Sequence, residues 1–464
     1  MRRAPLQRAT PLHDMRTQPP VLPGASATAS ESPADRALEL ALAGERDAAL
    51  RWAVAILRDD PAMSTAALLA GRLLREAGRL EVAREACTVA VERAIELENL
   101  PLAVAAAREA EQAGALVGPL LDTIAEAFAS DSPRFGQGAT PPVLLPAAES
   151  FHPLASALSG VSLWNKAAEY VHAAKKALDD GPRAPIGRVP LFSALDREGL
   201  RELVEALVPE WVRTGQRVLE QGQAGHDAYW VARGDLEARR TTRSGETLVL
   251  AKLASGAIFG EMALLSRSPR AGSVEALRAS VVVRISKSAL DALAARHPSI
   301  ATELGAHCRD RMVQNLLRTS PVLRVVPERD LPALVSMFRV VSFEANDKLV
   351  ARDQPPRGIY LIASGEIAVV TRDDHSSEPM VLKTLGPGDV VGEVATLLRR
   401  STTADVVAIH PTVCLFLPIA DFLGAVREHP SILAELYLLA VEREEETRAI
   451  LDEETATVED FDLL

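Results

Sequence analysis

The second half of this 464-residue chain repeats itself at an offset of about 131 to 132 residues, and the duplication leaves few possible folds. Residues 229–234 (YWVARG) align with 360–365 (YLIASG), and residues 260–263 (GEMA) align with 392–395 (GEVA). Each copy has short runs rich in β-branched residues, separated by turn glycines and interrupted by a helical Gly-Glu segment. We therefore expect two copies of one domain, each a small antiparallel barrel or jelly roll of about eight short strands with flanking helices.

The region before the duplication differs from it in composition and in the spacing of apolar residues. From residue 34 to about 130 the chain is rich in Ala, Leu, Glu and Arg, and its apolar residues recur at spacings of three and four, which predicts amphipathic helices. Breaks in this pattern predict about six helices. The breaks fall near Gly44, Asp59 to Pro61, Gly78, Leu100 to Pro101 and Gly114.

Small residues in this helical region also follow a 34-residue register. The pattern resembles a tetratricopeptide repeat, although small residues fill the positions where that motif carries large aromatic ones. A generic Ala-rich helical bundle accounts for the same spacing, and both interpretations stay open. The motif positions are Ala37, Ala49 and Pro61 in the first repeat and Gly71, Ala83 and Ala90 in the second, of which the pairs Ala37/Gly71 and Ala49/Ala83 are 34 residues apart.

Composition divides the rest of the chain. The sequence predicts an all-α region followed by two α+β domains, with Pro-rich and Gly-rich stretches as connections and an acidic end. The expected segments are 1–33, disordered and rich in Pro and Ser; 34–130, helical; 131–185, a linker with short helices; 186–318 and 319–440, the duplicated domains; and 441–464, a solvated and partly disordered acidic tail.

Charge and cysteine content exclude several classes of protein. The formal net charge is −12, and residues 441–464 alone hold ten acidic residues against two arginines. Such a balance argues against nucleic-acid binding by the whole surface. The three cysteines lie far apart without metal-ligand spacing, and no apolar run is long enough to span a membrane, so we expect a cytoplasmic protein without a metal site or membrane segment.

Residues 259–274, FGEMALLSRSPRAGSV, resemble the phosphate-binding cassette of the cyclic-nucleotide-binding domain family. A Gly-Glu pair, an apolar helical turn, a Pro-Arg pair and a closing Ser-Val stand at the family's spacing, and turn glycines precede them. The resemblance covers about residues 186–450. It implies a jelly-roll fold and a cyclic-nucleotide ligand, with no cofactor. The implied binding residues are Phe259, Gly260, Glu261, Met262, Ala263, Leu264, Pro269, Arg270, Ala271 and Ser273.

The residue types suit a cyclic phosphate. Gly260 permits close approach of the backbone, and the short helix that follows directs free N–H groups, expected from Ala263 and Leu264, toward an anion. The Arg270 guanidinium matches phosphate oxygens in a bidentate manner, and Pro269 helps to fix its loop. An isolated Glu and Arg at this spacing could instead form a surface ion pair. The surrounding cassette favours a binding site.

The resemblance also assigns the remaining groups of the ligand. Glu261 would accept a hydrogen bond from the ribose 2′-hydroxyl, and Ser273 would lie beside the base. Relatives that select cGMP commonly carry Thr directly after the Arg. This chain has Ala271 there, which favours cAMP over cGMP, while cyclic dinucleotides stay open.

The second copy, residues 391–406 (VGEVATLLRRSTTADV), departs from the pattern. Gly392 and Glu393 remain, but Ser401 and Thr402 replace the Pro-Arg pair and Asp405 replaces the closing Ser. Without the phosphate anchor, and with Asp405 adding repulsion, we expect a degenerate site retained for packing or for signal transmission.

The flanking sequence selects among the functions that the family implies. We find no helix-turn-helix, kinase signature or catalytic constellation, so we expect no enzymatic activity. The tandem arrangement resembles the regulatory subunit of cAMP-dependent protein kinase. The expected function is a cyclic-nucleotide sensor that couples ligand binding to domain rearrangement and regulates a protein partner bound through residues 34–130, with a kinase as the candidate partner. The alternative is a scaffold in which both barrels are structural.

Overall fold

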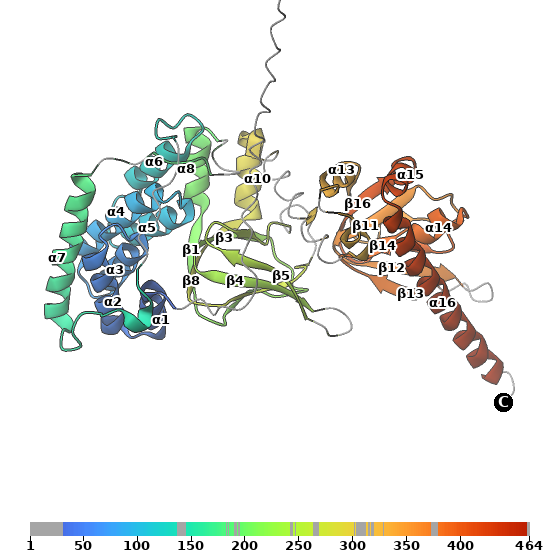
Figure 1. Cartoon of the computed structure of the whole chain (residues 1–464), viewed down its shortest axis with the longest axis horizontal. Coiled ribbons are helices and arrows are strands. Elements are labelled where there is room, and N and C mark those ends of the chain that lie inside the picture. Colours follow the sequence, from blue (N-terminus) through green and yellow to red (C-terminus); the bar gives the residue numbers. More distant parts are fainter. Residues whose placement is uncertain are drawn as a thin grey trace, which may run out of the picture.

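The computed structural model describes residues 31–461, except 137–144, 182, 184, 190–192, 194, 242–244, 246, 263–268, 301, 303–311, 314–315, 317–319, 328 and 373–378. Three bodies follow one another along the long axis of the molecule: a helical body, a first β domain and a second β domain (Figure 1). The predicted fold class is confirmed.

Six helices build the first part of the helical body. Ser32 begins it with a capping box, in which its hydroxyl accepts the Asp35 N–H and the Asp35 carboxylate accepts the Ser32 N–H. Three breaks adopt positive φ, at Gly44 (89°), Gly78 (74°) and Gly114 (85°), which only glycine tolerates without strain. The helices are α1 (Pro33–Ala43), α2 (Arg46–Asp59), α3 (Ser64–Glu76), α4 (Leu80–Glu96), α5 (Leu100–Gln112) and α6 (Val117–Phe128).

A seventh long helix, α7 (Gly160–Asp179), corrects the expectation of a linker with short helices over residues 131–185. A short 3-10 turn, η1 (Ala148–Ser150), precedes it. The helix packs against α2 and α4 at the outer edge of the helical body (Figure 1), because apolar residues at every third or fourth position form a buried stripe. The stripe consists of Leu163, Ala167, Val171 and Ala174. This segment is therefore part of the helical body.

The first β domain consists of two four-stranded antiparallel sheets with the strand orders β1-β8-β3-β6 and β2-β7-β4-β5. Helix α8 (Arg197–Ala206) precedes the sheets and α10 (Lys287–Arg296) follows them. The strands are β1 (Val208–Val212), β2 (Arg217–Leu219), β3 (Asp227–Arg233), β4 (Asp235–Thr241), β5 (Thr247–Ala254), β6 (Ile258–Phe259), β7 (Ser273–Ala276) and β8 (Ser280–Ser286).

The second β domain repeats this topology strand for strand, with the orders β9-β16-β11-β14 and β10-β15-β12-β13. The duplication seen in the sequence is therefore a duplication of the fold. Its strands are β9 (Arg339–Phe343), β10 (Lys348–Val350), β11 (Gly358–Ser364), β12 (Ile367–Arg372), β13 (Pro379–Leu385), β14 (Val390–Val391), β15 (Asp405–Ala408) and β16 (Thr412–Pro418). Its helices are α12 (Pro321–Arg324), α13 (Leu331–Ser336), α14 (Glu393–Leu398), α15 (Ile419–Glu428) and α16 (Pro430–Phe461).

Helix α16 corrects the expectation of a partly disordered tail, because it continues through the acidic segment as far as Phe461. The segment holds seven glutamates, and Glu is a strong helix former that can extend a helix already nucleated on the domain. In Figure 1 the far end of α16 projects beyond the second domain. Among the described helices, none has the length and apolar character needed to cross a membrane.

The helical body and the first β domain share one hydrophobic core. Helix α5 packs on β1, β3 and β8, and buried side chains of the strands, such as Trp230 and Val281, join the same cluster as those of the helices. Polar contacts reinforce the junction. Asn99 donates to the Ala232 carbonyl at 2.8 Å, and Arg72 lies 4.2 Å from the centroid of the Trp211 ring. The two bodies thus pack as one unit.

A buried carboxylate marks this junction. Asp35 on α1, with 3% of its surface exposed, pairs with Arg233 at the end of β3 and with Arg278 at 2.8 Å. Burial acts to raise the pKa of Asp35. Arg233, the hydrogen bonds from Ser32 and the charge of Arg278 outweigh that effect and hold the pKa below its ordinary value of 3.8.

Replacement of this carboxylate should weaken the junction. We expect Asp35→Asn to lower the free energy of unfolding by about 3 kcal/mol at pH 7, because it leaves Arg233 buried without its charge partner. Urea unfolding, followed by the intrinsic fluorescence of the four tryptophans, measures the change.

Exposed Asp131 provides the matched control, and Asp131→Asn should change stability by less than about 0.5 kcal/mol. Because the folded-state pKa of Asp35 is lowered, its contribution is complete above pH 3.8 and should disappear as the pH falls through the folded-state pKa. Equal stability of both variants at pH 7 would show that the pair does not hold the junction.

Candidate functional site

The first cassette begins where strand β6 ends. Phe259 stacks on Tyr229, with ring centroids 5.3 Å apart, and Gly260 follows with φ of +76°. A Cβ at Gly260 would lie 3.0 Å from the Arg270 Nη1 and 3.1 Å from the Asp227 carbonyl oxygen, so the turn requires glycine. Glu261 comes next and is buried, with 3% exposed.

The other cassette residues divide into two groups. Met262 packs against an apolar cluster that joins Met312 and Leu316 to the core of the second domain, and Pro269 and Ala271 line the space between the domains. The predicted phosphate donors Ala263 and Leu264 lie outside the described residues.

Arg270 connects three segments of the first domain. Its guanidinium donates from Nη1 to the Gly260 carbonyl at 2.9 Å and from Nη2 to the Asp227 carbonyl at 2.8 Å. Its backbone N–H donates to the Gln223 carbonyl, and its carbonyl accepts the Gly222 N–H, each at 2.9 Å. The residue therefore fixes the turn after β2, the start of β3 and the Gly-Glu turn in one arrangement.

Two neighbours of Arg270 were not predicted from the sequence. Gly225 leaves the space in which the guanidinium lies, since a Cβ there would be 2.7 Å from the Arg270 Nε. Asp227 supplies a carbonyl oxygen, a backbone role that no side-chain pattern reveals. A glycine in the turn ahead of β3 was the signal present in the sequence, but by itself it indicates only a turn.

The guanidinium is buried, with 8% of the residue exposed, and among the described residues it forms no ion pair with a carboxylate. Burial lowers the pKa of Arg270, while Tyr229, Asp227 and Glu261 act in the opposite direction. The Arg270 guanidinium nevertheless stays protonated, because arginine is not deprotonated in proteins. The site thus holds a desolvated positive charge against backbone carbonyls, an arrangement that an incoming anion would stabilise.

Ser273 closes the cassette at the start of β7. Its hydroxyl accepts the Gln221 N–H at 3.0 Å. The Gln221 side chain in turn exchanges hydrogen bonds of 2.9 and 2.8 Å with the backbone of Thr241, at the end of β4. Ser273 therefore links the cassette to the edge of β4 in this structure.

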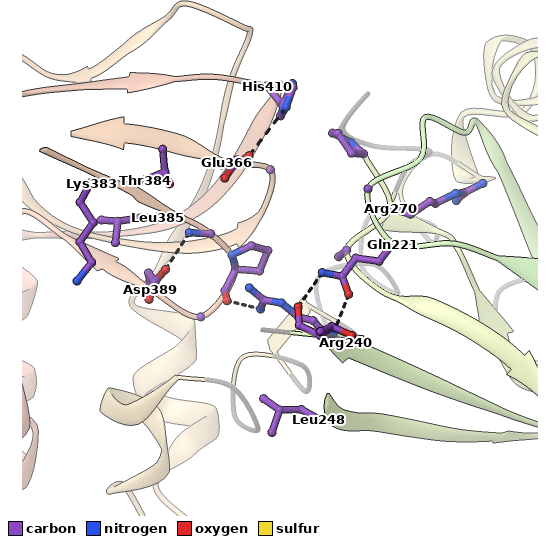
Figure 2. Close-up of a pocket in the computed structure, with 18 of the residues that line it drawn as sticks. Gln221, Arg240, Leu248, Arg270, Glu366, Lys383, Thr384, Leu385, Asp389 and His410 are labelled. Atoms are coloured by element: carbon purple, nitrogen blue, oxygen red, sulfur yellow. Dashed lines mark hydrogen bonds and ion pairs between the residues drawn. The ribbon is translucent and has the colours of Figure 1, made fainter. Parts of the chain in front are cut away.

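A cavity of about 580 Å³ lies between the two β domains and borders the first cassette (Figure 2). Arg240 of β4 reaches across it and donates to the carbonyl of Pro387, in the turn between β13 and β14. In Figure 2 the Arg270 side chain points away from the second domain, back into the first. The cavity and the buried guanidinium thus lie on opposite sides of the Arg270 backbone.

In the second domain Thr402 occupies the place of Arg270. The Asp353 N–H donates to the Thr402 carbonyl at 2.8 Å, and the Thr402 N–H donates to the Gln354 carbonyl at 3.0 Å, which repeats the backbone pattern around Arg270. Asp353 adopts φ of +62°, the same left-handed turn as Gly222. The Thr402 hydroxyl donates to the Ala351 carbonyl at 2.5 Å. A short neutral side chain therefore stands where the first copy has its guanidinium.

The other second-site residues retain their places. Gly392 has φ of +88° and precedes α14, and Glu393 is buried, with 2% exposed. Asp405 takes the structural role of Ser273, because its Oδ1 accepts the Arg352 N–H at 2.8 Å while its Oδ2 lies 2.9 Å from the Lys348 Nζ. The negative charge that we expected to repel a ligand is thus paired with Lys348.

Comparison with known proteins agrees with this geometry. The family model described as the cyclic nucleotide-binding domain matches residues 209–297 and 340–429. Both stretches fall within the predicted segments 186–318 and 319–440, whose exact boundaries stay a prediction.

Among curated proteins, the chain is similar to cGMP-dependent protein kinase 2 of mouse (27% identical over 278 residues) and of human (26% over 278 residues). Each match covers 59% of this chain but only 34% of the relative, so the chain spans about a third of the length of these relatives.

Solved structures with similarity include the regulatory domain of Toxoplasma gondii PKA with cAMP, at 21% identity, 55% coverage of this chain, 92% of that chain and a TM-score of 0.27. Another is the regulatory subunit of a cAMP-independent protein kinase A from Trypanosoma brucei. It has 22% identity and a TM-score of 0.26, and the match covers 53% of this chain and 85% of that chain.

The family match and the repeated sheet order agree with the resemblance of the first cassette. Residues 209–297 and 340–429 of this chain are two cyclic nucleotide-binding domains in tandem.

Proposed function

We propose that the first domain is a cyclic-nucleotide sensor whose ligand is cAMP, and that the chain acts as a regulatory protein. The observation that carries this proposal is the buried Arg270 guanidinium, which is held by two carbonyls in a cassette with a glycine turn and a buried Glu261. A cyclic phosphate would bring the negative charge that this cation lacks. Glu261 would accept the ribose hydroxyl.

Base selectivity depends on the residue after Arg270. Ala271 has no hydroxyl for a guanine amino group, and the Ser273 hydroxyl already accepts the Gln221 N–H. This arrangement favours cAMP, although the similar curated kinases carry cGMP in their names. Binding should therefore be measured with both cAMP and cGMP.

We further propose that ligand binding changes the arrangement of the two β domains. The first cassette borders the cavity between them, and Met262 of the cassette packs against an apolar cluster that joins Met312 and Leu316 to the core of the second domain. A ligand that binds one domain arrangement more tightly than another shifts the population toward it. The helical body would move with the first domain, because the two share a core.

A protein partner is proposed for residues 34–130. The similarity to cyclic-nucleotide-dependent kinases makes a protein kinase the first candidate to test.

Removal of the phosphate anchor should abolish tight binding. We expect wild-type chain to bind cAMP at one site, and Arg270→Ala to weaken binding by roughly 30-fold to several-thousand-fold, because loss of one partner of a desolvated charge pair costs about 2–5 kcal/mol. Isothermal titration calorimetry with cAMP and cGMP measures affinity, stoichiometry and base preference together.

The matched control is Arg213→Ala, which removes an exposed arginine of the same domain and should leave the affinity unchanged. Absence of binding by wild-type chain, with thermal shift as a second readout, would contradict the proposed sensor and favour the scaffold.

The proposed rearrangement has its own measurement. We expect saturating cAMP to change the small-angle scattering curve of the wild-type chain, since the first cassette borders a cavity that separates the two β domains. The Arg270→Ala chain should give the same curve with and without cAMP. Superimposable wild-type curves at a cAMP concentration that calorimetry shows to be saturating would rule out the rearrangement while leaving ligand binding intact.

A further inference from the structure

Helix α16 reaches into the cassette of the second domain. The Arg443 Nη1 lies 2.5 Å from the Oε1 of buried Glu393, and the same nitrogen donates to the Val390 carbonyl. Glu393 is the counterpart of Glu261, the residue assigned to the ribose in the first domain. A guanidinium from the chain's own helix therefore contacts the polar group that a second ligand would need.

Other contacts hold α16 in this position. Ile432, Leu436 and Ala440 recur at every fourth residue and are buried against the domain. Beyond them, Arg400 at the end of α14 pairs with Glu444 of α16 at 3.0 Å. The first half of the helix is thus anchored by apolar contacts, and the turn around Arg443 is held by ion pairs.

The remaining ligand positions of this cassette are also engaged by the protein. Thr402 supplies no positive charge and uses its hydroxyl on the Ala351 carbonyl. Asp405 pairs with Lys348 and the Arg352 N–H. The side chains of Glu393, Thr402 and Asp405, which hold the ribose-binding, phosphate-anchoring and closing positions of this cassette, therefore each have a partner within the chain.

We propose that the second cassette is the docking site of the chain's own helix α16, with Arg443 in the role of a resident ligand, so that this domain stays closed without a nucleotide. A ribose could reach Glu393 only by displacing Arg443. Arg443 also lines the cavity beside the first cassette, so the docked turn contributes to the surface that faces the first domain. This inference does not depend on ligand binding by the first domain.

The test is hydrogen exchange of the full chain without nucleotide, with variants at Arg443. In Arg443→Ala, amides of residues 439–446 should exchange about tenfold faster or more, because the turn loses the ion pair that holds it. Residues 430–437 should keep their protection, since their apolar contacts are untouched. Arg443→Gln preserves the length of the side chain and should give a smaller increase in the same segment.

Arg427→Ala removes an exposed arginine from the neighbouring helix α15 and is the matched control. The docking proposal is wrong if neither Arg443 variant accelerates exchange at 439–446 relative to this control. It is equally wrong if cAMP added to the Arg270→Ala chain alters exchange at 390–405, because a nucleotide would then enter the second cassette. Calorimetric failure of cAMP binding in the first domain would leave these outcomes unchanged.

Discussion

The geometry of the first cassette depends on the placement of one guanidinium. Arg270 is buried, and its side chain and backbone together hold the Gly-Glu turn, the turn after β2 and the start of β3. The arrangement requires the absence of a side chain at Gly225 and a left-handed backbone at Gly260. A cation that is desolvated in this way is costly by itself, and its hydrogen bonds to carbonyl oxygens join three segments of the first domain.

The two cassettes share backbone hydrogen bonds but differ in their charged side chains. Thr402 and Asp405 reproduce the backbone hydrogen bonds made around Arg270 and by Ser273, so the second domain keeps the turn geometry with different side chains. The positive charge of Arg270 has no counterpart at Thr402, and Arg443 enters from another element. The backbone arrangement of the cassette is therefore the same in the two copies. Its guanidinium comes from Arg270 in the first copy and from Arg443 of α16 in the second.

Much of this organisation could be predicted because it resides in local patterns. The duplication, the turn glycines and the periodic apolar residues indicated two β domains behind a helical region. The contacts of Arg270 with carbonyl oxygens could not be predicted. Every residue type has a backbone carbonyl, so the sequence does not show that the carbonyl of Asp227 is an acceptor. The role of Arg443 was missed because its partner lies 50 residues away. Helices within residues 131–185 were expected, but the length of α7 and its packing on the helical body were not, because the Pro-rich sequence ahead of it indicated a linker.

The helical body and the first β domain share one core. The predicted boundary at residue 186 therefore marks a change in amino-acid composition but no break in packing. Trp230, Ala232, Val281 and Val283 lie on the face of the sheet that the helices cover. A fragment starting at residue 186 would present these side chains to water as a contiguous apolar patch, a surface prone to aggregation. The smallest soluble unit that carries the first cassette should therefore include the helices before it.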